Sequence, residues 1–456
     1  MKPILTLKMK LSVFTIACFS LILLANPNSG LCSSIKATAV AATVASDYSS
    51  AAHSVISVEP VNGARTVQND LLPTATSDIS LSAYKNFFYR IERYQADNIT
   101  KFDINAPDVP VWQFSTMDEN ETGTSNPYGL FFVNSQKAYL LRYGTTKAWI
   151  VNPSATTQAN FKIGELDLSA YADSDGIPEM TYGVIIGYKF FILMQRLDRD
   201  NSFLPSNTPY IAVFDVSNDK EIDTGTTNDD NLMGIALNVK NPGAIQYLEQ
   251  NNTIYIQAVG DYGSSWSGRD PEYSGGIISI NPETYEVKTV LDDGDADNHP
   301  YGNISGMSII SSTKGYFVGY AGWGDNSLYT FNPSSGDAAV LANNELKNKN
   351  IAGMASGTYA DQNNMLWVCN QTDSQIIILD TADNSINEKI STNLNPVSIV
   401  FTYEKIVNKE SEKDTTDDGG GSGGCFIASA GHNTATSFLF ILLAACFGLG
   451  FSALKR

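Results

Sequence analysis

Residues 366–381, with the sequence LWVCNQTDSQIIILDT, decide the fold. An apolar run at 366–368 leads into polar residues at 370–375, and a second apolar run at 376–379 ends on Asp380 and Thr381. Short runs of β-branched or aromatic residues bounded by Asn, Asp and Ser are typical of β-strands. The stretch therefore predicts two antiparallel strands joined by a tight turn.

The same pattern recurs along the chain. The second strand ends on an acid or amide in seven copies, at Glu59, Asp103, Asn152, Asp215, Asn281, Asn332 and Asp380. A partner strand precedes each copy, a third strand follows most of them, and a fourth usually precedes the partner. Four strands per unit at a spacing near 40–50 residues predict a β-propeller with seven blades.

The two ends of the repeat region complement each other. The first unit, near residues 39–69, has three strands and lacks an innermost one, whereas residues 396–403 form an innermost strand without partners. Pairing them closes the ring one strand plus three and removes both free sheet edges. We predict an all-β, seven-bladed propeller over residues 33–404. A β-sandwich with extra strands, or six blades with the first unit detached, are the alternatives.

The quoted stretch resembles the repeat of YVTN-type propellers, which are related to the quinoprotein amine dehydrogenase β-chain fold. Trp367, Val368 and Asn370 match the first strand of that repeat, with Cys369 in the place of Thr. Residues 380–382, Asp-Thr-Ala, match the end of the second strand. The resemblance covers about residues 39–403 and implies the seven-bladed fold. Such propellers serve as binding proteins, cofactor scaffolds and enzymes, so it does not fix a function.

Both ends of the chain predict export. Residues 1–32 are typical of a signal peptide, with three lysines before an apolar run at 11–25. Residues 405–424 form a polar, Gly-rich stalk. Within 425–456, Cys425 is followed by an apolar stretch at 437–454, long enough for a transmembrane helix, and a basic end. This order resembles bacterial C-terminal sorting signals and implies that Cys425 is processed; the alternative is a permanent membrane anchor.

Charge and residue counts exclude several classes of function. The net charge of −19 opposes binding to a phosphate backbone, so we expect no nucleic-acid partner. Three scattered histidines disfavour a His-rich metal site or a His-based triad, and Cys369 alone in the body rules out an internal disulfide framework.

Five long connections predict a functional surface on one face of the propeller. These are 197–209 and 260–275, assigned to the third and fourth blades, and the crossings 166–180, 221–231 and 292–303. We therefore place the site around blades three to five, on the face that carries these loops. The candidate ligand-binding residues are Asp198, Asp200, Asp261, Tyr262, Trp266, Tyr273, Tyr301 and Trp323.

Calcium is the candidate cofactor, because hard cations prefer clustered carboxylate oxygens. The candidate metal ligands are Asp173, Asp175, Glu179, Asp293, Asp295 and Asp297. Neither run completes an EF-hand, since the twelfth positions are Val184 and Ile304. Solvated turn aspartates are the alternative reading of both runs.

We interpret the chain as an exported binding module, surface-displayed or membrane-anchored, rather than an enzyme. Its partner would be a surface protein, a glycan or a small cationic ligand bound at an acidic, aromatic-bearing face. One alternative is a metal- or cofactor-dependent enzyme, such as a lyase, a lactone hydrolase or a quinoprotein-like enzyme, with its site in the axial funnel. Another is a structural surface-layer component.

Overall fold

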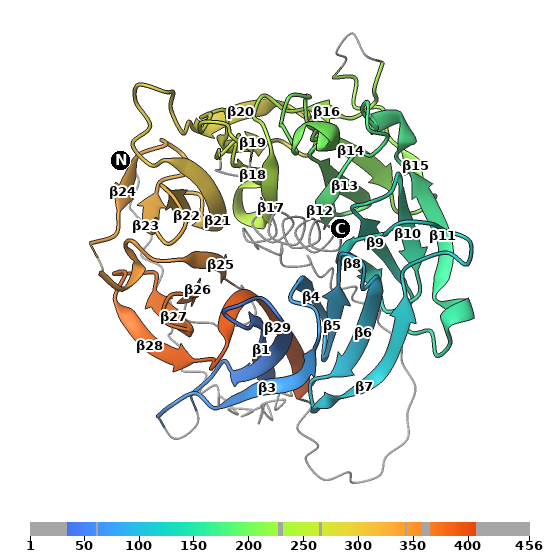
Figure 1. The fold of residues 1–456 in the computed structure, drawn as a ribbon, viewed down its shortest axis with the longest axis horizontal. Helices are drawn as coiled ribbons and strands as arrows, with labels where there is room; N and C mark the ends of the chain where they lie inside the picture. The colour runs from blue at the N-terminus through green and yellow to red at the C-terminus, as the bar shows by residue number, and fades with distance from the viewer. Residues whose placement is uncertain are drawn as a thin grey trace, which may run out of the picture.

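The computed structural model is a seven-bladed β-propeller and describes residues 34–60, 63–226, 231–263, 267–342, 344–356 and 365–406. Seven antiparallel sheets surround a central axis (Figure 1). The predicted signal peptide, almost all of the stalk, the hydrophobic tail and Cys425 lie outside the described residues. Within the described part, no helix is long and apolar enough to cross a membrane.

The first three blades run from the closing blade onward. Blade one comprises β29 (Asn395–Ile406), β1 (Ser34–Val44), β2 (Ala51–Ser57) and β3 (Val67–Thr74). Blade two comprises β4 (Ile79–Tyr84), β5 (Phe87–Glu92), β6 (Asn98–Asp103) and β7 (Ala106–Ser115). Blade three comprises β8 (Pro127–Asn134), β9 (Lys137–Arg142), β10 (Lys147–Val151) and β11 (Lys162–Asp167).

The other four blades follow in chain order. Blade four comprises β12 (Met180–Ile186), β13 (Lys189–Met194), β14 (Tyr210–Asp215) and β15 (Lys220–Glu221), with β16 (Ile235–Ala236) also on β14. Blade five comprises β17 (Pro242–Leu248), β18 (Thr253–Ala258), β19 (Gly276–Ile280) and β20 (Val287–Leu291). Blade six comprises β21 (Asn303–Ser311), β22 (Lys314–Tyr320), β23 (Asn326–Phe331) and β24 (Ala338–Val340). Blade seven comprises β25 (Ile351–Ala355), β26 (Met365–Asn370), β27 (Gln375–Asp380) and β28 (Ile386–Ser391).

The described helices are single 3-10 turns in the connections. They are η1 (Gln158–Asn160), η2 (Ser169–Tyr171), η3 (Arg199–Asn201), η4 (Glu249–Asn251) and η5 (Asn344–Leu346).

The ring closes as the sequence predicts. β29 pairs antiparallel with β1 from Ser34–Ile406 to Val44–Asn395, so the last strand becomes the innermost strand of blade one. The quoted stretch forms β26 and β27 and supports this closure, because Trp367 is buried and meets the edge of Phe401 of β29 with ring centroids 5.6 Å apart. The sandwich and six-blade alternatives are therefore wrong.

Burial explains why the middle strands are apolar throughout. All six residues of β26 are buried, whereas β28 alternates between partly and fully exposed positions over most of its length. A middle strand packs against a neighbouring blade on each face, while an outer strand has solvent on one side. Hydrophobic clusters accordingly join neighbouring blades around the ring.

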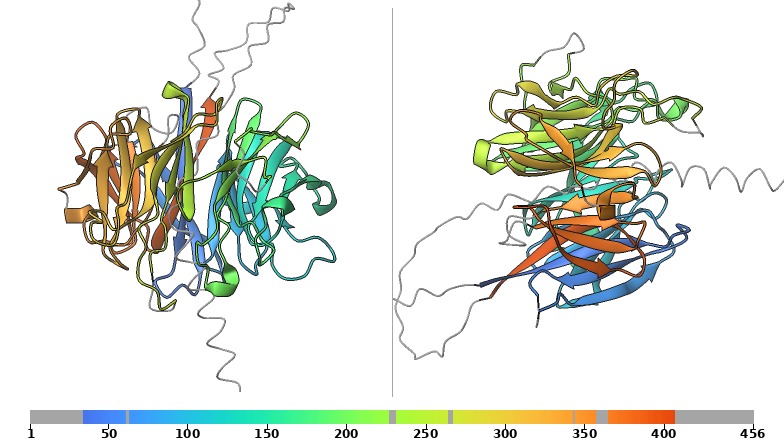
Figure 2. Two further views of the ribbon diagram at one scale, coloured as in Figure 1. Left: turned by 90° about the horizontal axis from the view of Figure 1, so that it is seen from above. Right: turned by 90° about the vertical axis from the view of Figure 1, so that its left-hand side faces the viewer.

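The two faces of the propeller have different roles. Ser34 and Ile406 are paired at one end of the β1–β29 ladder, and the β1–β2 turn lies at the other end. Both ends of the described chain therefore leave from one face, which we call the bottom face. Figure 2 shows the blades from the side, with β1 and β29 extending beyond their neighbours on that face. Connections between second and third strands, and crossings between blades, lie on the opposite face, the top face.

Candidate functional site

The long connections gather on the top face, but one blade later than the sequence numbering assigned them. Residues 197–209 lie in blade four and 260–275 in blade five, while 292–303 crosses from blade five to blade six. The assignment to the third and fourth blades was wrong by one, because these connections precede the strands that end on Asp215 and Asn281, which are the fourth and fifth of the seven copies. The predicted surface therefore covers blades four to six, and we call it the loop face.

Side chains tie the connections of the loop face to one another. The guanidinium of Arg269 donates to the backbone carbonyls of Asn201 and Ser202 at 3.3 and 3.2 Å. The amide of Asn207 donates to a carboxylate oxygen of Asp173 at 2.6 Å. Lys240 Nζ donates to the carbonyls of residues 206 and 207 at 3.0 and 2.8 Å. Loops held in this way lose little entropy when they bind a ligand.

Two predicted ligand-binding acids instead hold the loops together. Asp261 is buried and forms an ion pair with Arg269 at 2.5 Å. Asp198 accepts the backbone N–H of Asn201 at 3.0 Å and caps the 3-10 turn η3. Asp200 of the same turn is exposed and accessible to a ligand.

The predicted metal ligands also accept bonds from the protein itself. Asp175 accepts the N–H groups of Ile177 and Arg199, each at 2.9 Å. Asp295 accepts the N–H groups of Asp297 and Asn298 at 2.9 and 2.8 Å. Within the described ranges, no group of three or more His, Cys, Asp or Glu is arranged to hold a metal ion. Calcium binding stays a prediction, which melting temperatures in calcium and in chelator would test.

The predicted aromatic residues divide between surface and core. Tyr273 stacks on His299 with ring centroids 4.1 Å apart, and Trp323 is 53% exposed. Tyr262 meets the edge of Tyr320 at 5.9 Å. Tyr301 is edge-on to both Phe317 and Tyr329, which stack on each other, and it is partly buried against the core of blade six. Trp266 lies outside the described residues.

Glu179 lies beneath the loop face, not on it. Its side chain is fully buried, Oε2 accepts the backbone N–H of Leu197 at 3.0 Å, and Oε1 lies 3.9 Å from Nε of Arg199. Burial, reinforced by the charge of Asp175, raises the pKa of Glu179 to about 9. At neutral pH this carboxyl is therefore protonated and can donate a hydrogen bond.

The backbone at Glu179 is unusual for its residue type. The residue immediately before the innermost strand is left-handed in four successive blades, with φ of 44° at Asn126, 48° at Glu179, 58° at Asn241 and 64° at Gly302. Asn and Gly adopt this conformation readily, and a glutamate does not. The left-handed turn itself does not need a carboxyl, and such outliers gather at functional sites.

Asp293 is the second buried carboxyl of the region. It accepts the N–H of Gly275 at 3.2 Å, and burial, with the charge of Asp292, raises its pKa to about 7. Position 275 requires glycine, because a Cβ there would clash with the backbone carbonyl oxygen of Ala258 and lie 2.8 Å from the Asp293 carboxylate. Asp293 thus joins the loop of blade five to the next crossing, and its charge changes near neutral pH.

Sequence reasoning missed a buried polar cluster beside Glu179. Arg93 follows β5 and Tyr143 follows β9, and both side chains are 1% exposed. Arg93 pairs with Asp78 at 3.1 Å and lies 3.8 Å from the ring centre of Tyr128. The sequence signal that could have revealed the cluster is a polar residue directly after the apolar second strand of a blade. This position holds Arg93, Tyr143 and Gln195 in blades two to four.

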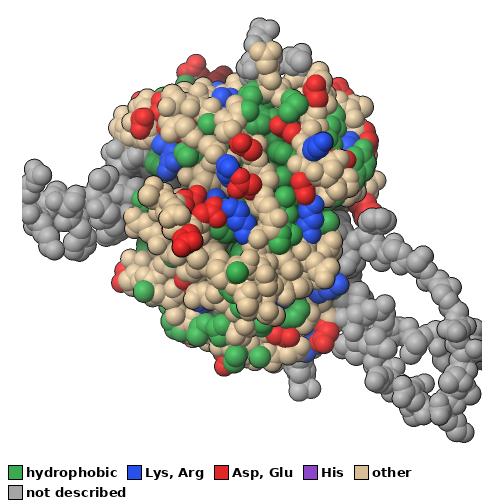
Figure 3. Space-filling view, turned by 90° about the vertical axis from the view of Figure 1, so that its right-hand side faces the viewer, with side chains coloured by type: hydrophobic (Ala, Val, Ile, Leu, Met, Phe, Trp, Pro, Cys, Tyr) green, Lys and Arg blue, Asp and Glu red, His purple; other side chains and the backbone are tan. Residues whose placement is uncertain are grey.

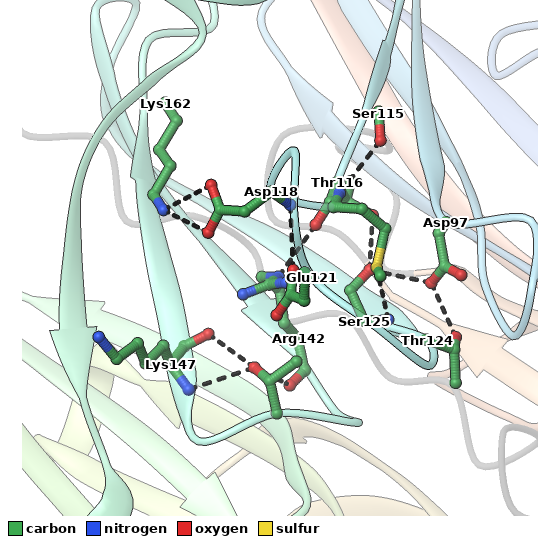
Figure 4. Close-up of polar contacts among 12 residues, drawn as sticks. Asp97, Ser115, Thr116, Asp118, Glu121, Thr124, Ser125, Arg142, Lys147 and Lys162 are labelled. Atoms are coloured by element: carbon green, nitrogen blue, oxygen red, sulfur yellow. Dashed lines mark hydrogen bonds and ion pairs between the residues drawn. The ribbon is translucent and has the colours of Figure 1, made fainter.

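The crossing from blade two to blade three, residues 116–126, was also missed. Asp97 Oδ1 accepts Thr124 Oγ1, Ser125 Oγ and the N–H of Asn126 at 2.8–2.9 Å (Figure 4). Arg142 donates to the carbonyl of Thr116 at 3.0 Å and pairs with Glu121. This crossing is therefore held in place as firmly as the loop face.

The net negative charge does not form one continuous acidic surface. On the side of the molecule with β10, β11 and β15, basic and acidic side chains lie next to each other (Figure 3). Lys162 contacts both Asp118 and Glu165, at 2.7 and 3.3 Å, and Lys147 also contacts Glu165. Electrostatic attraction of a cationic ligand is therefore weaker over this side than the net charge alone suggests.

Comparison with known proteins identifies the fold and no family. No protein-family model matches this chain, and no curated protein matches it. A candidate 6-phosphogluconolactonase from Bacteroides fragilis matches with a TM-score of 0.51 and 10% identity, over 80% of this chain and 98% of that one. AztD from Citrobacter koseri matches with a TM-score of 0.45 and 15% identity, over 81% of this chain and 99% of that one. The likeness to the first of these structures establishes the propeller fold alone.

Proposed function

We propose that this chain is an exported β-propeller binding module that takes a surface protein or glycan at its loop face. The supporting observation is that the long connection of blade four is fastened to that of blade five by Arg269 and to the crossing at 166–180 by Asn207. A rigid scaffold that presents ordered loops is the usual basis of a recognition surface. Asp200, Tyr273 and Trp323 lie where a partner could reach them.

The direction in which the chain leaves the propeller supports this proposal. The sequence that follows Ile406 carries the predicted stalk and tail, and Ile406 lies on the bottom face. An anchor made from that segment would hold the propeller by the bottom face and present the loop face outward. The predicted YVTN relationship and the sorting signal belong to the same proposal.

An enzyme is the second candidate, favoured by the buried carboxyls of Glu179 and Asp293. Carboxyls with a raised pKa are typical of general acids. This candidate would act on a lactone or a related substrate, with a metal or cofactor in the axial funnel. A structural surface-layer role, the third possibility, requires self-association, which size-exclusion chromatography would detect.

Replacement of Arg269 by alanine tests the binding role. The variant removes the contacts to residues 201 and 202, so we expect at least a tenfold loss of affinity for envelope glycans or proteins captured by the full chain. Arg65→Ala is the matched control, because Arg65 pairs with Glu388 at 2.6 Å between blades one and seven, away from the loop face. Equal binding by wild type and Arg269→Ala, or equal loss in both variants, would contradict the proposal.

A further inference from the structure

Three buried side chains near the axis carry polar atoms without a hydrogen-bond partner. These atoms are Nε and Nη2 of Arg93, the hydroxyl of Tyr143 and Oε1 of Glu179. The three residues are 1%, 1% and 0% exposed. Buried polar groups in proteins are nearly always satisfied, and each one left unsatisfied destabilises the fold by about 1–3 kcal/mol. Their concentration in one place indicates a missing binding partner.

The three side chains belong to one compact cluster. The Tyr128 ring contacts two of them, with the Arg93 guanidinium 3.8 Å from its centre and the Tyr143 ring stacked at 5.2 Å. Tyr143 in turn is close enough to Glu179 and Arg93 for their charges to influence its hydroxyl. The residues come from the top-face ends of the two innermost strands of blades two to four, beside the central axis (Figure 1).

The unsatisfied groups of Arg93, Tyr143 and Glu179 can all donate a hydrogen bond at neutral pH. Arg93 offers two N–H groups, and Tyr143 and protonated Glu179 each offer an O–H. The carboxylate nearby, Asp78, accepts the N–H of Tyr94 on Oδ2, while its Oδ1 lies 3.1 Å from Arg93 Nη1 in an ion pair and has no hydrogen bond of its own. A water molecule bound here would also need acceptors for its own two hydrogens. A carboxylate has only acceptor atoms and can form two parallel hydrogen bonds with a guanidinium.

We propose that Arg93, Tyr143 and Glu179 form a binding subsite for a carboxylate anion. The ligand is either a free small carboxylate or the acid group of a larger molecule such as a sugar acid. The inference goes beyond the proposed function, because Arg93 and Tyr143 lie in blades two and three, outside the loop face. Glu179 contacts the loop face through the N–H of Leu197, so variants of Tyr143 and Arg269, which each belong to one site, distinguish loss of the two.

Calorimetry and thermal unfolding of the full chain, with acetate and with gluconate, test this subsite. We expect both anions to raise the melting temperature in a saturable way at constant ionic strength. A response to acetate alone would identify a free small carboxylate as the ligand, and a response to gluconate alone would identify a larger acid. No response to either anion would overturn the proposal.

Tyr143→Phe removes one donor without breaking any bond within the described protein. We expect about a tenfold loss of carboxylate affinity, together with an unchanged or higher melting temperature of the free protein. Arg93→Met should abolish binding but risks unfolding, because it leaves Asp78 unpaired. Tyr255→Phe is the control, since Tyr255 is also buried but lies in blade five. Unchanged affinity in Tyr143→Phe would overturn the proposal and leave ordered water as the occupant.

Discussion

At the scale of single residues, function is indicated by positions where one blade has a different type of residue from the equivalent positions of other blades. Asn126, Asn241 and Gly302 fit the left-handed position before an innermost strand, and Glu179 occupies the equivalent position with a buried carboxyl. The left-handed turn does not require that carboxyl, although its Oε2 accepts the buried N–H of Leu197. Its protonation therefore makes the stability of the fold depend on pH.

Glu179→Gln should stabilise the protein in alkaline solution. The carboxyl has its ordinary pKa near 4.5 when unfolded and about 9 when folded, so the unfolded state releases its proton first. The contribution of the protonated Glu179 carboxyl to stability is fully present below pH 4.5 and is lost as the pH rises through 9. Urea unfolding at pH 8 should show a gain of up to about 5 kcal/mol for the variant, since pH 8 lies about 3.5 units above the unfolded pKa and each unit corresponds to about 1.4 kcal/mol.

The pH dependence separates this effect from a general gain in packing. At pH 4 the variant and the wild type should have similar stability, because both side chains are then neutral in both states. Glu249→Gln, an exposed carboxyl, should change stability little at either pH. A gain of the same size at pH 4 and pH 8 would contradict the assigned protonation.

At the scale of elements, the top-face crossings depend on single carboxylates that accept several donors. Asp97 accepts three donors from residues 124–126 and thereby fixes the left-handed turn at Asn126 before β8 (Figure 4). Asp118 of the same crossing forms an ion pair with Lys162, but its side chain is 48% exposed. The two aspartates therefore contribute very differently to stability.

Asp97→Ala should destabilise the protein by about 2–4 kcal/mol, because it leaves three donors with poor access to water. Asp118→Ala should cost less than about 1 kcal/mol, because exposed ion pairs are weak. Denaturant titrations of the two variants would check the difference. Asp97→Asn keeps one acceptor oxygen and should fall between them. Similar losses for both alanine variants would show that the crossing does not rely on Asp97.

Elements were more predictable from the sequence than the site. Apolar runs such as 376–379 determine strands locally, and the unpaired run at 396–403 predicted the closure by β29. The role of a charged side chain depends on partners that are distant in the sequence. Asp173 bonds to Asn207, and Glu179 lies beside Tyr143 of another blade. In the sequence, the loop aspartates therefore could not be distinguished from metal ligands. Arg93 could not be distinguished from an ordinary polar residue at the end of a strand. Tertiary contacts alone distinguish these cases.

At the scale of the whole molecule, stability depends on closing the ring. Deletion of 395–406 removes β29, exposes the edge of β1 and takes Val397, Ile399 and Val400 out of two core clusters. We expect aggregation or loss of cooperative unfolding, because an open β edge pairs with other chains. Deletion of 407–456 leaves the ladder intact and should preserve the melting temperature. Circular dichroism and size-exclusion chromatography would compare the two truncations.

The position of Ile406 on the bottom face also determines how the whole molecule could be attached to a cell. If Cys425 is the processed residue, protein extracted from the envelope should lack residues 437–456, because a sorting enzyme cuts near the motif. Cys425→Ala should then retain the tail, which mass spectrometry of the intact protein would show. Cys446→Ala, a cysteine beyond the motif, is the control and should be processed normally. An intact tail in the wild-type protein would instead support a permanent anchor, with the loop face still directed away from the membrane.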